Sequence, residues 1–319
     1  MGKPVPVFRD FVGQNRIVRV VRRIIAGAKA KGEACLAVLL LGFSGLGKTT
    51  FGQAMALEYG TKIHFLYSCE KITAITIAQE AEKWAPFDFV FIDEAHRLSA
   101  DAQEILYRVL VEGKVPKLGP IEDGKPRRII GETDVPPITI VAATDQGGIL
   151  KTAFKKRFGL EFHFRPYTHR EMIAIVRMRA AKLKMLLSPQ AARALAASCR
   201  GNPRIAGLRL QTMRHFFADR NHAQYTRAHI ERLLRNLEID NTNRTRLDRR
   251  FMICLSKHGE TGVSLSSLAL ALSIDSNLLR TDVEPFLIQE GWVGIAPRGR
   301  FLTQAGKDLV ANDLEGTSK

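Results

Sequence analysis

The sequence has little cysteine and no long apolar segment. Its four cysteines, Cys35, Cys69, Cys199 and Cys254, lie far apart and form no C-x-x-C pair. This spacing argues against a zinc site and against a disulfide scaffold, and it fits a reducing cytoplasm. The longest uninterrupted apolar run near the N-terminus covers residues 35–41, far below the roughly 20 residues that a membrane-spanning helix needs. We therefore expect a cytoplasmic protein with no membrane partner.

A surplus of positive charge is confined to one part of the chain. The 319 residues include 48 Lys and Arg against 32 Asp and Glu, a formal net charge of +16. Residues 151–250 hold 23 Lys and Arg and 7 Asp and Glu, and the other 219 residues hold 25 of each sign. A basic block of this size suggests a polyanionic partner such as nucleic acid. A solvated surface that balances acidic neighbours is the alternative, and composition leaves it open.

A glycine-rich phosphate-binding motif follows an apolar segment. Residues 37–41 have the composition of a short buried strand and run into Gly42-Phe43-Ser44-Gly45-Leu46-Gly47-Lys48-Thr49, which fits G-x-x-x-x-G-K-[ST]. Glycines let successive backbone amides point at phosphate oxygens, and the following helix adds its positive end. We expect Lys48 to reach the β- and γ-phosphates and the Thr49 hydroxyl to ligate Mg²⁺. The alternative, a turn that matches by chance, is disfavoured by the strand–loop–helix context.

A second apolar segment ends in two carboxylates. Residues 88–92 are typical of a parallel strand buried on both faces, and Asp93 and Glu94 follow it. Asp93, at the carboxyl end of the strand, is placed to hold the magnesium shell. Glu94 is then the natural base for the attacking water. A simple helix N-cap is the alternative, and the glycine-rich loop upstream argues against it.

A third apolar segment, residues 138–143, ends in Thr144 and Asp145. Polar groups at the end of such a strand could sense the γ-phosphate or help to position the water. An ordinary strand-to-loop turn explains the same residues, and this motif alone does not decide between the two.

These motifs, in this order, resemble those of AAA+ ATPases and, more narrowly, those of the RuvB family of bacterial Holliday-junction branch migration motors. The similarity covers about residues 8 to 310. It rests on residues 11–14, 42–50, 91–98, 157–159, 201–206, 284–291 and 297–300. The resemblance implies an α/β P-loop AAA+ large domain with a parallel sheet (residues 1–166), an all-helical lid (167–242) and a C-terminal winged helix (243–319).

The resemblance also implies roles for single residues. Asp145 matches the polar position of sensor 1, and Arg157 matches the arginine finger that reaches a neighbouring subunit's ATP. Arg204 matches sensor 2. The implied catalytic residues are Lys48, Asp93, Glu94, Asp145, Arg157 and Arg204, and the implied metal ligands are Thr49 and Asp93. The implied nucleotide-binding residues are Val12 and Gly13, which cover the adenine, and Gly42, Gly45, Leu46, Gly47, Lys48, Thr49, Thr50 and Arg204.

Arginine suits the arginine-finger role and the sensor 2 role because its planar guanidinium matches the geometry of phosphate oxygens, and lysine cannot replace it. An arginine finger supplied by a neighbour requires an oligomer, and the family forms rings of about six subunits. Without the resemblance, Arg157 reads as one more base in a basic run.

The middle of the chain is helical by periodicity. Residues 169–185, 189–200, 203–220 and 226–239 show the pattern, with Thr168 and Ser188 as N-caps and Gly201 as a stop. This matches the lid of AAA+ proteins. The lid carries much of the surplus charge, and part of that charge can face acidic neighbours or ATP phosphates rather than DNA.

Residues 114–134 predict a β-hairpin, because Glu122-Asp123-Gly124 supplies a turn. RuvB proteins carry a hairpin here that docks on RuvA, their junction-recognition partner, through a largely apolar surface. This hairpin has Arg127 and Arg128 and few large apolar tips, which puts binding to a standard RuvA in doubt. A solvated surface hairpin is the alternative.

The last quarter has the pattern of a winged helix. Helical segments at residues 247–258, 264–272 and 275–289 precede two strand candidates, residues 292–296 and 300–303. The third helix is rich in acidic residues and is a poor reader of the major groove. Arg298 and Arg300, around a glycine, suit sequence-independent contact with DNA phosphates. A winged helix used only for protein contacts is the alternative, and the segment after Val310 is expected to be frayed.

Three hypotheses follow. The first is an ATP- and Mg²⁺-dependent motor that moves duplex DNA and drives Holliday-junction branch migration with a RuvA-like partner. The second is a RuvB-derived ATPase of a phage or mobile element, recruited through the altered hairpin by another DNA-processing protein. The third is an ATP-binding switch with weak hydrolysis, which the intact Lys48, Asp93, Glu94 and Arg157 argue against. Residues 93–96 also spell the DEAH box of another helicase class, which we reject because the chain has no second tandem core domain.

Overall fold

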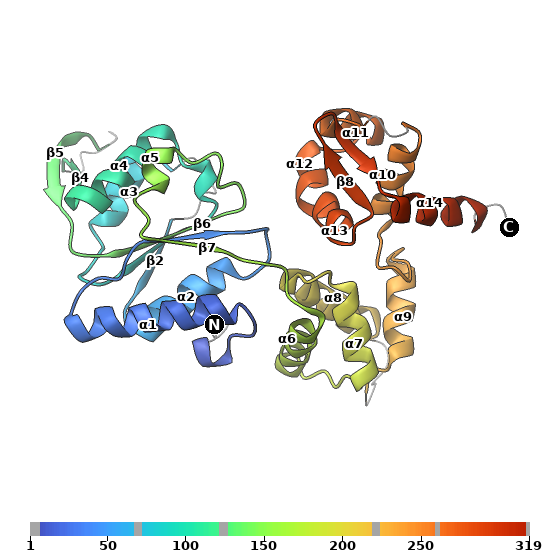
Figure 1. The fold of residues 1–319 in the computed structure, drawn as a ribbon. Helices are drawn as coiled ribbons and strands as arrows, with labels where there is room; N and C mark the ends of the chain where they lie inside the picture. The colour runs from blue at the N-terminus through green and yellow to red at the C-terminus, as the bar shows by residue number, and fades with distance from the viewer. Residues whose placement is uncertain (1–6, 67–71, 121–126, 219–223, 259–261, 317–319) are drawn as a thin grey trace. The chain divides into compact units, whose positions relative to one another are not determined.

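The computed structural model describes residues 7–66, 72–120, 127–218, 224–258 and 262–316, and the chain forms two compact units, residues 1–167 and 168–319 (Figure 1). The first unit is built on a parallel sheet of five strands in the order β2-β3-β6-β1-β7. These strands are β1 (Val38–Leu41), β2 (Ile63–Leu66), β3 (Phe89–Ile92), β6 (Thr139–Thr144) and β7 (Leu160–His163). The expected α/β fold with a parallel sheet is confirmed.

Helices cover both faces of this sheet (Figure 1). One face carries α1 (Asn15–Lys31) and α2 (Lys48–Tyr59), and the other carries α3 (Ala74–Ala81), α4 (Ala100–Glu112) and α5 (Thr152–Lys155). Strands β1, β3 and β6 are buried at every residue, which explains their continuous apolar sequences. Helix α2 packs so closely on β3 that a Cβ on Gly52 would lie 2.3 Å from the ring of Phe91. Short 3₁₀ turns complete the unit at η1 (Phe8–Asp10) and η2 (Ala95–Arg97).

The strand order brings the three sequence motifs together. Strand β6 lies between β3 and β1, and all three run in the same direction. Their carboxyl ends therefore meet at one edge of the sheet, where the glycine loop, Asp93 and Asp145 follow β1, β3 and β6.

The predicted hairpin is present at residues 114–134. Strand β4 (Lys114–Leu118) pairs antiparallel with β5 (Ile129–Asp134), and the expected turn at residues 122–124 lies outside the described residues. Arg127 anchors the hairpin, because its guanidinium pairs with Glu82, the C-cap of α3, at 2.7 and 3.0 Å. Strand β5 is exposed along its whole length, with Ile129 49% and Ile130 61% exposed. The hairpin thus presents more large apolar surface than its sequence suggested.

The second unit begins with the expected all-helical lid. It contains α6 (His169–Lys182), α7 (Pro189–Ser198), α8 (Pro203–Phe216) and α9 (Arg227–Asn236). Thr168 and Glu171 form a capping box on α6, and the Ser188 hydroxyl accepts a hydrogen bond from the Ala191 amide at the start of α7. Both predicted N-caps are confirmed.

A winged helix follows the lid. It contains α10 (Arg246–Ser256), α11 (Leu265–Leu272), α12 (Ser276–Leu278), the π-helical turn η3 (Leu279–Val283), α13 (Glu284–Gln289), β8 (Val293–Ala296), β9 (Gly299–Leu302) and α14 (Gln304–Gly316). The helix predicted over residues 275–289 is confirmed as one unbroken helical stretch over 276–289, but its middle turn, η3, is π-helical, which the sequence did not predict. Pro285 has no amide hydrogen for the i−4 carbonyl, and the π turn directly before α13 accommodates the missing hydrogen bond. The domain boundary at residues 242–243 stays a prediction.

The segment after Val310 is not frayed as far as it is described, because α14 runs on to Gly316. Asp313 explains this order. Its two carboxylate oxygens accept hydrogen bonds from the Arg244 guanidinium, both at 2.9 Å. Arg244 is only 3% exposed, and an isolated buried charge would be costly, so the paired Asp313 ties the last helix to the start of the winged helix.

The described cysteines Cys35, Cys199 and Cys254 are free, and Cys69 lies outside the described residues. Burial raises the pKa of Cys35 and of Cys199 to about 11, so both thiols stay protonated near neutral pH. In the same described part of the chain, no helix combines the length and the apolar character that crossing a membrane requires.

Candidate active site

The loop between β1 and α2 has the geometry of a phosphate cradle. Gly42 has φ +144°, and a Cβ there would lie 2.7 Å from the carbonyl oxygen of Phe164, so a larger residue does not fit. Gly47 has φ +93° at the N-cap of α2. Lys48 is 7% exposed, and its Nζ donates to the carbonyl oxygens of Gly42 at 2.5 Å and of Phe43 at 2.9 Å. The ammonium group therefore lies within the curl of the loop, where phosphate oxygens can replace the two carbonyls.

Thr49 and Asp93 meet although they follow different strands. The Thr49 hydroxyl donates to Asp93 Oδ2 at 3.3 Å, and Asp93 Oδ1 accepts a hydrogen bond from the Glu94 amide at 3.2 Å. A hydroxyl and a carboxylate are the oxygen ligands that Mg²⁺ takes beside nucleotide phosphates. The donor set of this pair therefore fits a magnesium ion bound with a nucleotide.

A polar cluster lies beside this pair at the ends of β3 and β6. His96 Nδ1 lies 3.0 Å from Thr144 Oγ1 and 3.5 Å from both Glu94 Oε2 and Asp145 Oδ1. Asp145 Oδ1 is buried and has no hydrogen-bond partner among the described residues, whereas the Glu94 side chain is 37% exposed. Ligand atoms of the three titratable residues lie within 4.8 Å of one another. Glu94 and Asp145 follow the neighbouring strands β3 and β6, so His96 links two strand ends at the same edge of the sheet.

The segment around Val12 and Gly13 lies against the glycine loop. A Cβ on Gly47 would lie 3.8 Å from the Phe11 ring and 3.6 Å from the Tyr167 hydroxyl, which donates to the Leu46 carbonyl at 3.0 Å. Phe11, which directly precedes Val12 and Gly13, thus lies beside the loop.

The two arginines predicted to contact the nucleotide belong to different units, Arg157 to the first and Arg204 to the second. Arg157 is exposed and follows α5, and its guanidinium contacts Tyr107 of α4, on the face of the sheet opposite α2. Arg204 belongs to the second unit. Its side chain is exposed in the first turn of α8, and its amide donates to Asn202 Oδ1 at 2.9 Å.

The two wing arginines differ in their surroundings. Arg298 is exposed at the tip between β8 and β9, and its guanidinium forms no hydrogen bond or ion pair with the residues that the structure describes. Arg300 pairs through Nε and NH2 with Glu284 of α13, which is only 4% exposed. Gly299 lets the wing pass close to the segment before α11, because a Cβ on residue 299 would lie 2.2 Å from the Val263 carbonyl oxygen.

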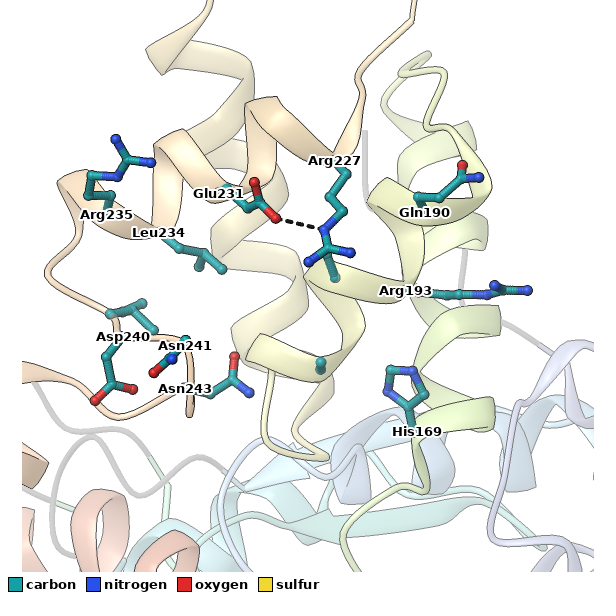
Figure 2. A pocket seen from close by; sticks show the side chains of 13 residues that line it. His169, Gln190, Arg193, Arg227, Glu231, Leu234, Arg235, Asp240, Asn241 and Asn243 are labelled. Carbon is teal, nitrogen blue, oxygen red and sulfur yellow. Dashed lines mark hydrogen bonds and ion pairs between the residues drawn. The ribbon is translucent and has the colours of Figure 1, made fainter. Parts of the chain in front are cut away.

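A cavity of about 710 Å³ lies in the lid, between α7, α9 and the N-terminus of α6 (Figure 2). Arg227 projects into it but is paired with Glu231 at 2.6 Å, and Figure 2 shows Arg193 and Arg235 extending outward. None of the residues predicted for the nucleotide or DNA line this cavity, so we do not assign it to either.

Some site residues were not predicted from the sequence. The sequence predicts no site role for His96, although His96 follows Glu94 by two residues within the segment 91–98 that carries the family resemblance. Tyr107 and Tyr167 carry no local signal, because each contacts its partner across 50 residues or more.

Family models match the chain in three consecutive stretches. Residues 4–164 match the Holliday junction DNA helicase RuvB P-loop domain, residues 167–240 match the RuvB AAA lid domain, and residues 245–311 match the RuvB C-terminal winged helix domain. The chain belongs to the RuvB family.

RuvB relatives resemble the chain over nearly its whole length. The Holliday junction branch migration complex subunit RuvB of Gluconobacter oxydans (strain 621H) is 36% identical over 298 residues, 93% of this chain and 84% of the relative. That of Paramagnetospirillum magneticum is 34% identical over 298 residues, 93% of this chain and 85% of the relative. The solved structure of the Thermotoga maritima RuvB Holliday junction branch migration motor is 28% identical and matches with a TM-score of 0.84, covering 96% of this chain and 98% of that one. A mutant of the same RuvB is 27% identical with a TM-score of 0.86, covering 97% and 99%.

Proposed function

We propose that this chain is an ATP- and Mg²⁺-dependent motor that acts as a ring of about six copies, moves duplex DNA and drives Holliday-junction branch migration. The observation that carries the proposal is the contact between Thr49 and Asp93 beside the glycine loop, in a chain of the RuvB family. The relatives named above support the junction as the substrate. A cytoplasmic location belongs to the same proposal, because the motor must meet DNA.

Lys48, Thr49 and Asp93 hold the nucleotide in this proposal. Lys48 exchanges its two carbonyl partners for β- and γ-phosphate oxygens, and Thr49 and Asp93 supply oxygen ligands to the ion. When bound, Mg²⁺ neutralises charge on the phosphates. The backbone of Gly42, Gly45, Leu46, Gly47 and Thr50 completes the cradle, and Val12 and Gly13 cover the base.

Glu94 acts as the base that takes a proton from the attacking water. Its partly exposed carboxylate lies at the strand end, as that role requires. His96 contacts both Glu94 and the Thr144–Asp145 pair, so we assign to His96 and Asp145 the task of orienting Glu94. Water is then held between the carboxylate and the γ-phosphate without a further protein base.

Arg157 and Arg204 complete the site from outside the loop. Arg157 is exposed and can reach the nucleotide of a neighbouring copy, which makes hydrolysis depend on ring assembly. Arg204 contacts the phosphates from the lid, so that the nucleotide state sets the position of the second unit.

The wing of the winged helix grips DNA through Arg298. An exposed guanidinium at a hairpin tip suits phosphate contact without base reading. Arg300 supports the wing instead, because contact with DNA would take its charge away from buried Glu284. Of the two expected DNA contacts, we therefore retain Arg298.

The hairpin is the docking surface for a partner of the RuvA type. Ile129 and Ile130 are consecutive residues of β5, both are exposed, and large apolar side chains exposed on a surface favour protein contact. The same surface could serve the second candidate function, in which another DNA-processing protein recruits the ATPase. Branch migration assays with and without a RuvA protein distinguish the two.

ATP hydrolysis in the presence of Mg²⁺, with and without a four-way junction, tests the proposal. We expect stimulation by the junction and loss of hydrolysis in Glu94→Gln. Electron micrographs with an ATP analogue should show rings around duplex DNA. A folded wild-type chain without DNA-stimulated hydrolysis would overturn the motor function.

A further inference from the structure

The turn between α7 and α8 carries two arginines in opposite surroundings. Arg204 is exposed on α8, whereas the side chain of Arg200 is only 8% exposed. Arg200 and Gly201 have positive φ angles of 55° and 66°, which reverse the chain within two residues. The Asn202 amide donates to the Cys199 carbonyl at 2.9 Å, and the Asn202 side chain accepts from the Arg204 amide. One short, well-bonded turn thus holds both arginines.

Arg200 reaches from the lid into the winged helix. Its guanidinium pairs with Asp248, a fully buried residue of α10, and donates to the Asn243 carbonyl at 3.1 and 2.6 Å. The same guanidinium lies over the Phe286 ring of α13, 3.9 Å from the ring centroid. The planar guanidinium donates in its plane and stacks through its face at once, which a lysine ammonium cannot do. Arg200 therefore joins the turn to two helices of the winged helix.

Helix α13 continues this connection to the wing. Glu284, two residues before Phe286, is buried and pairs with Arg300 of β9. Arg300 and Val263 also exchange two backbone hydrogen bonds of 2.8 Å, which fix β9. Arg298 lies two residues before Arg300 at the exposed tip. Two ion pairs with buried carboxylates, Arg200–Asp248 and Arg300–Glu284, thus connect the turn that carries Arg204 to the wing through α10 and α13.

We propose that Arg200 is a positioning residue that couples nucleotide sensing at the α7–α8 turn to DNA engagement by the wing. The inference rests on the proposed function, because it assumes that Arg204 meets the nucleotide and Arg298 meets DNA. Separating a buried ion pair leaves a desolvated charge, so a displacement of the turn is passed on to α10 and α13 rather than absorbed at the contact. Arg200 itself touches neither nucleotide nor DNA.

The experiment compares Arg200→Met and Arg200→Lys with Arg193→Met, which alters an exposed arginine on the same helix α7. ATP hydrolysis is measured with and without duplex DNA, together with duplex affinity and thermal stability. We expect DNA stimulation to fall roughly five- to tenfold in both Arg200 variants, the lower end of typical coupling between sites. Hydrolysis without DNA and duplex affinity should stay within about twofold of wild type, and Arg193→Met should behave as wild type.

Two results would overturn this inference. One is full DNA stimulation in folded Arg200 variants, and the other is a loss of stimulation that only follows a loss of stability or duplex affinity.

Should Arg200→Met fail to fold, Arg200→Lys keeps a charge beside Asp248, and amide exchange of β8–β9 on addition of an ATP analogue gives the second readout. We expect protection in wild type that is absent in Arg200→Lys, and equal protection would contradict the coupling. A wild type without DNA stimulation overturns the proposed function and this inference together, whereas equal stimulation in wild type and variants overturns the coupling alone.

Discussion

The guanidinium of Arg157 lies over the ring of Tyr107, 4.9 Å from its centroid, and donates a 2.9 Å hydrogen bond to the Tyr107 hydroxyl. Arg157 follows α5 and Tyr107 belongs to α4, so the contact joins neighbouring elements on one face of the sheet. Exposed cation–π contacts are worth only about 0.5–1 kcal/mol. The contact can therefore hold the arginine in the isolated chain and release it to the phosphates of a neighbouring copy.

Replacing Arg157 should abolish hydrolysis without abolishing nucleotide binding. We expect Arg157→Ala to lower the ATPase rate by about 10³-fold or more, the effect of an arginine finger in GTPases. Tyr107→Phe, which removes only the hydrogen bond, should stay within about twofold of wild type. Mixing Arg157→Ala with Glu94→Gln chains should restore activity, because some interfaces then combine an intact arginine with an intact base. An inactive mixture that still forms rings would contradict action across the interface.

Variants of Glu94 and Lys48 should affect two different steps, ATP hydrolysis and ATP binding. Glu94→Gln is expected to bind ATP as wild type does and to hydrolyse it about 10²–10⁴ times more slowly, because only the base is lost. Lys48→Ala should weaken ATP binding itself, because the loop loses its charge. Fluorescent-nucleotide titration and phosphate release measure the two effects. Equal losses of binding in both variants would refute the assigned roles.

The wing should contribute salt-dependent, sequence-independent affinity for DNA. Arg298→Ala is expected to weaken duplex binding and to reduce the slope of log affinity against log salt by about 0.9, the value for one phosphate contact. Hydrolysis without DNA should be unchanged. Arg300→Ala should instead lower thermal stability, because Glu284 is left buried and unpaired. An unchanged salt slope in Arg298→Ala would remove this residue from the DNA interface.

The exposed isoleucines of β5 should matter only when the partner is present. The double variant Ile129→Asp/Ile130→Asp is expected to keep its own ATPase activity and to lose stimulation by a RuvA protein, because charge would replace the apolar docking surface. Lys117→Ser on the paired strand β4 is the control and should respond as wild type does. Full RuvA stimulation of the double variant would show that the hairpin is not the docking site.

Asp88 should make the large domain sensitive to acid. Burial by itself would raise the pKa of this carboxyl, but hydrogen bonds with His64 at 2.8 Å, Thr61 at 2.7 Å and the Ala85 amide at 3.0 Å outweigh it and hold the pKa below its ordinary value. A lowered pKa stabilises the fold above the unfolded-state value, near pH 4, and this stabilisation is lost as the pH falls through the folded-state value. Denaturant unfolding at several pH values measures the free energy of unfolding. Below about pH 4 this free energy should fall less steeply in Asp88→Asn than in wild type, and at higher pH Asp88→Asn should be the less stable of the two. Asp134→Asn, at an exposed position, is the control, and an equal effect in both variants would contradict the assignment.

The parts of the fold that the sequence predicts are those specified by contiguous residues. Strands β1, β3 and β6 are buried on both faces and appear as apolar runs, and the glycine loop contains its own geometric requirements. Because parallel strands end at one edge of a sheet, the meeting of Thr49 and Asp93 was predictable from the motifs alone.

Contacts between distant segments were not predictable in this way. The sequence marks Arg300 as a base beside a glycine, but its buried partner Glu284 lies 16 residues earlier, on a helix. Likewise, the local sequence around Asp313 is typical of a polar tail, and its ion-pair partner Arg244 lies 69 residues earlier. In each case the pairing depends on which distant segments pack together, and no local sequence pattern indicates that.

The most direct test of the central claim is dissociation of a labelled synthetic four-way junction by the purified chain with its RuvA-type partner. We expect wild type to convert the junction into duplex products with ATP and Mg²⁺. No conversion is expected when a non-hydrolysable analogue replaces ATP, and none is expected from Glu94→Gln. Junction processing that proceeds equally in Glu94→Gln, or no processing by rings that bind DNA and hydrolyse ATP, would contradict a motor driven by this site.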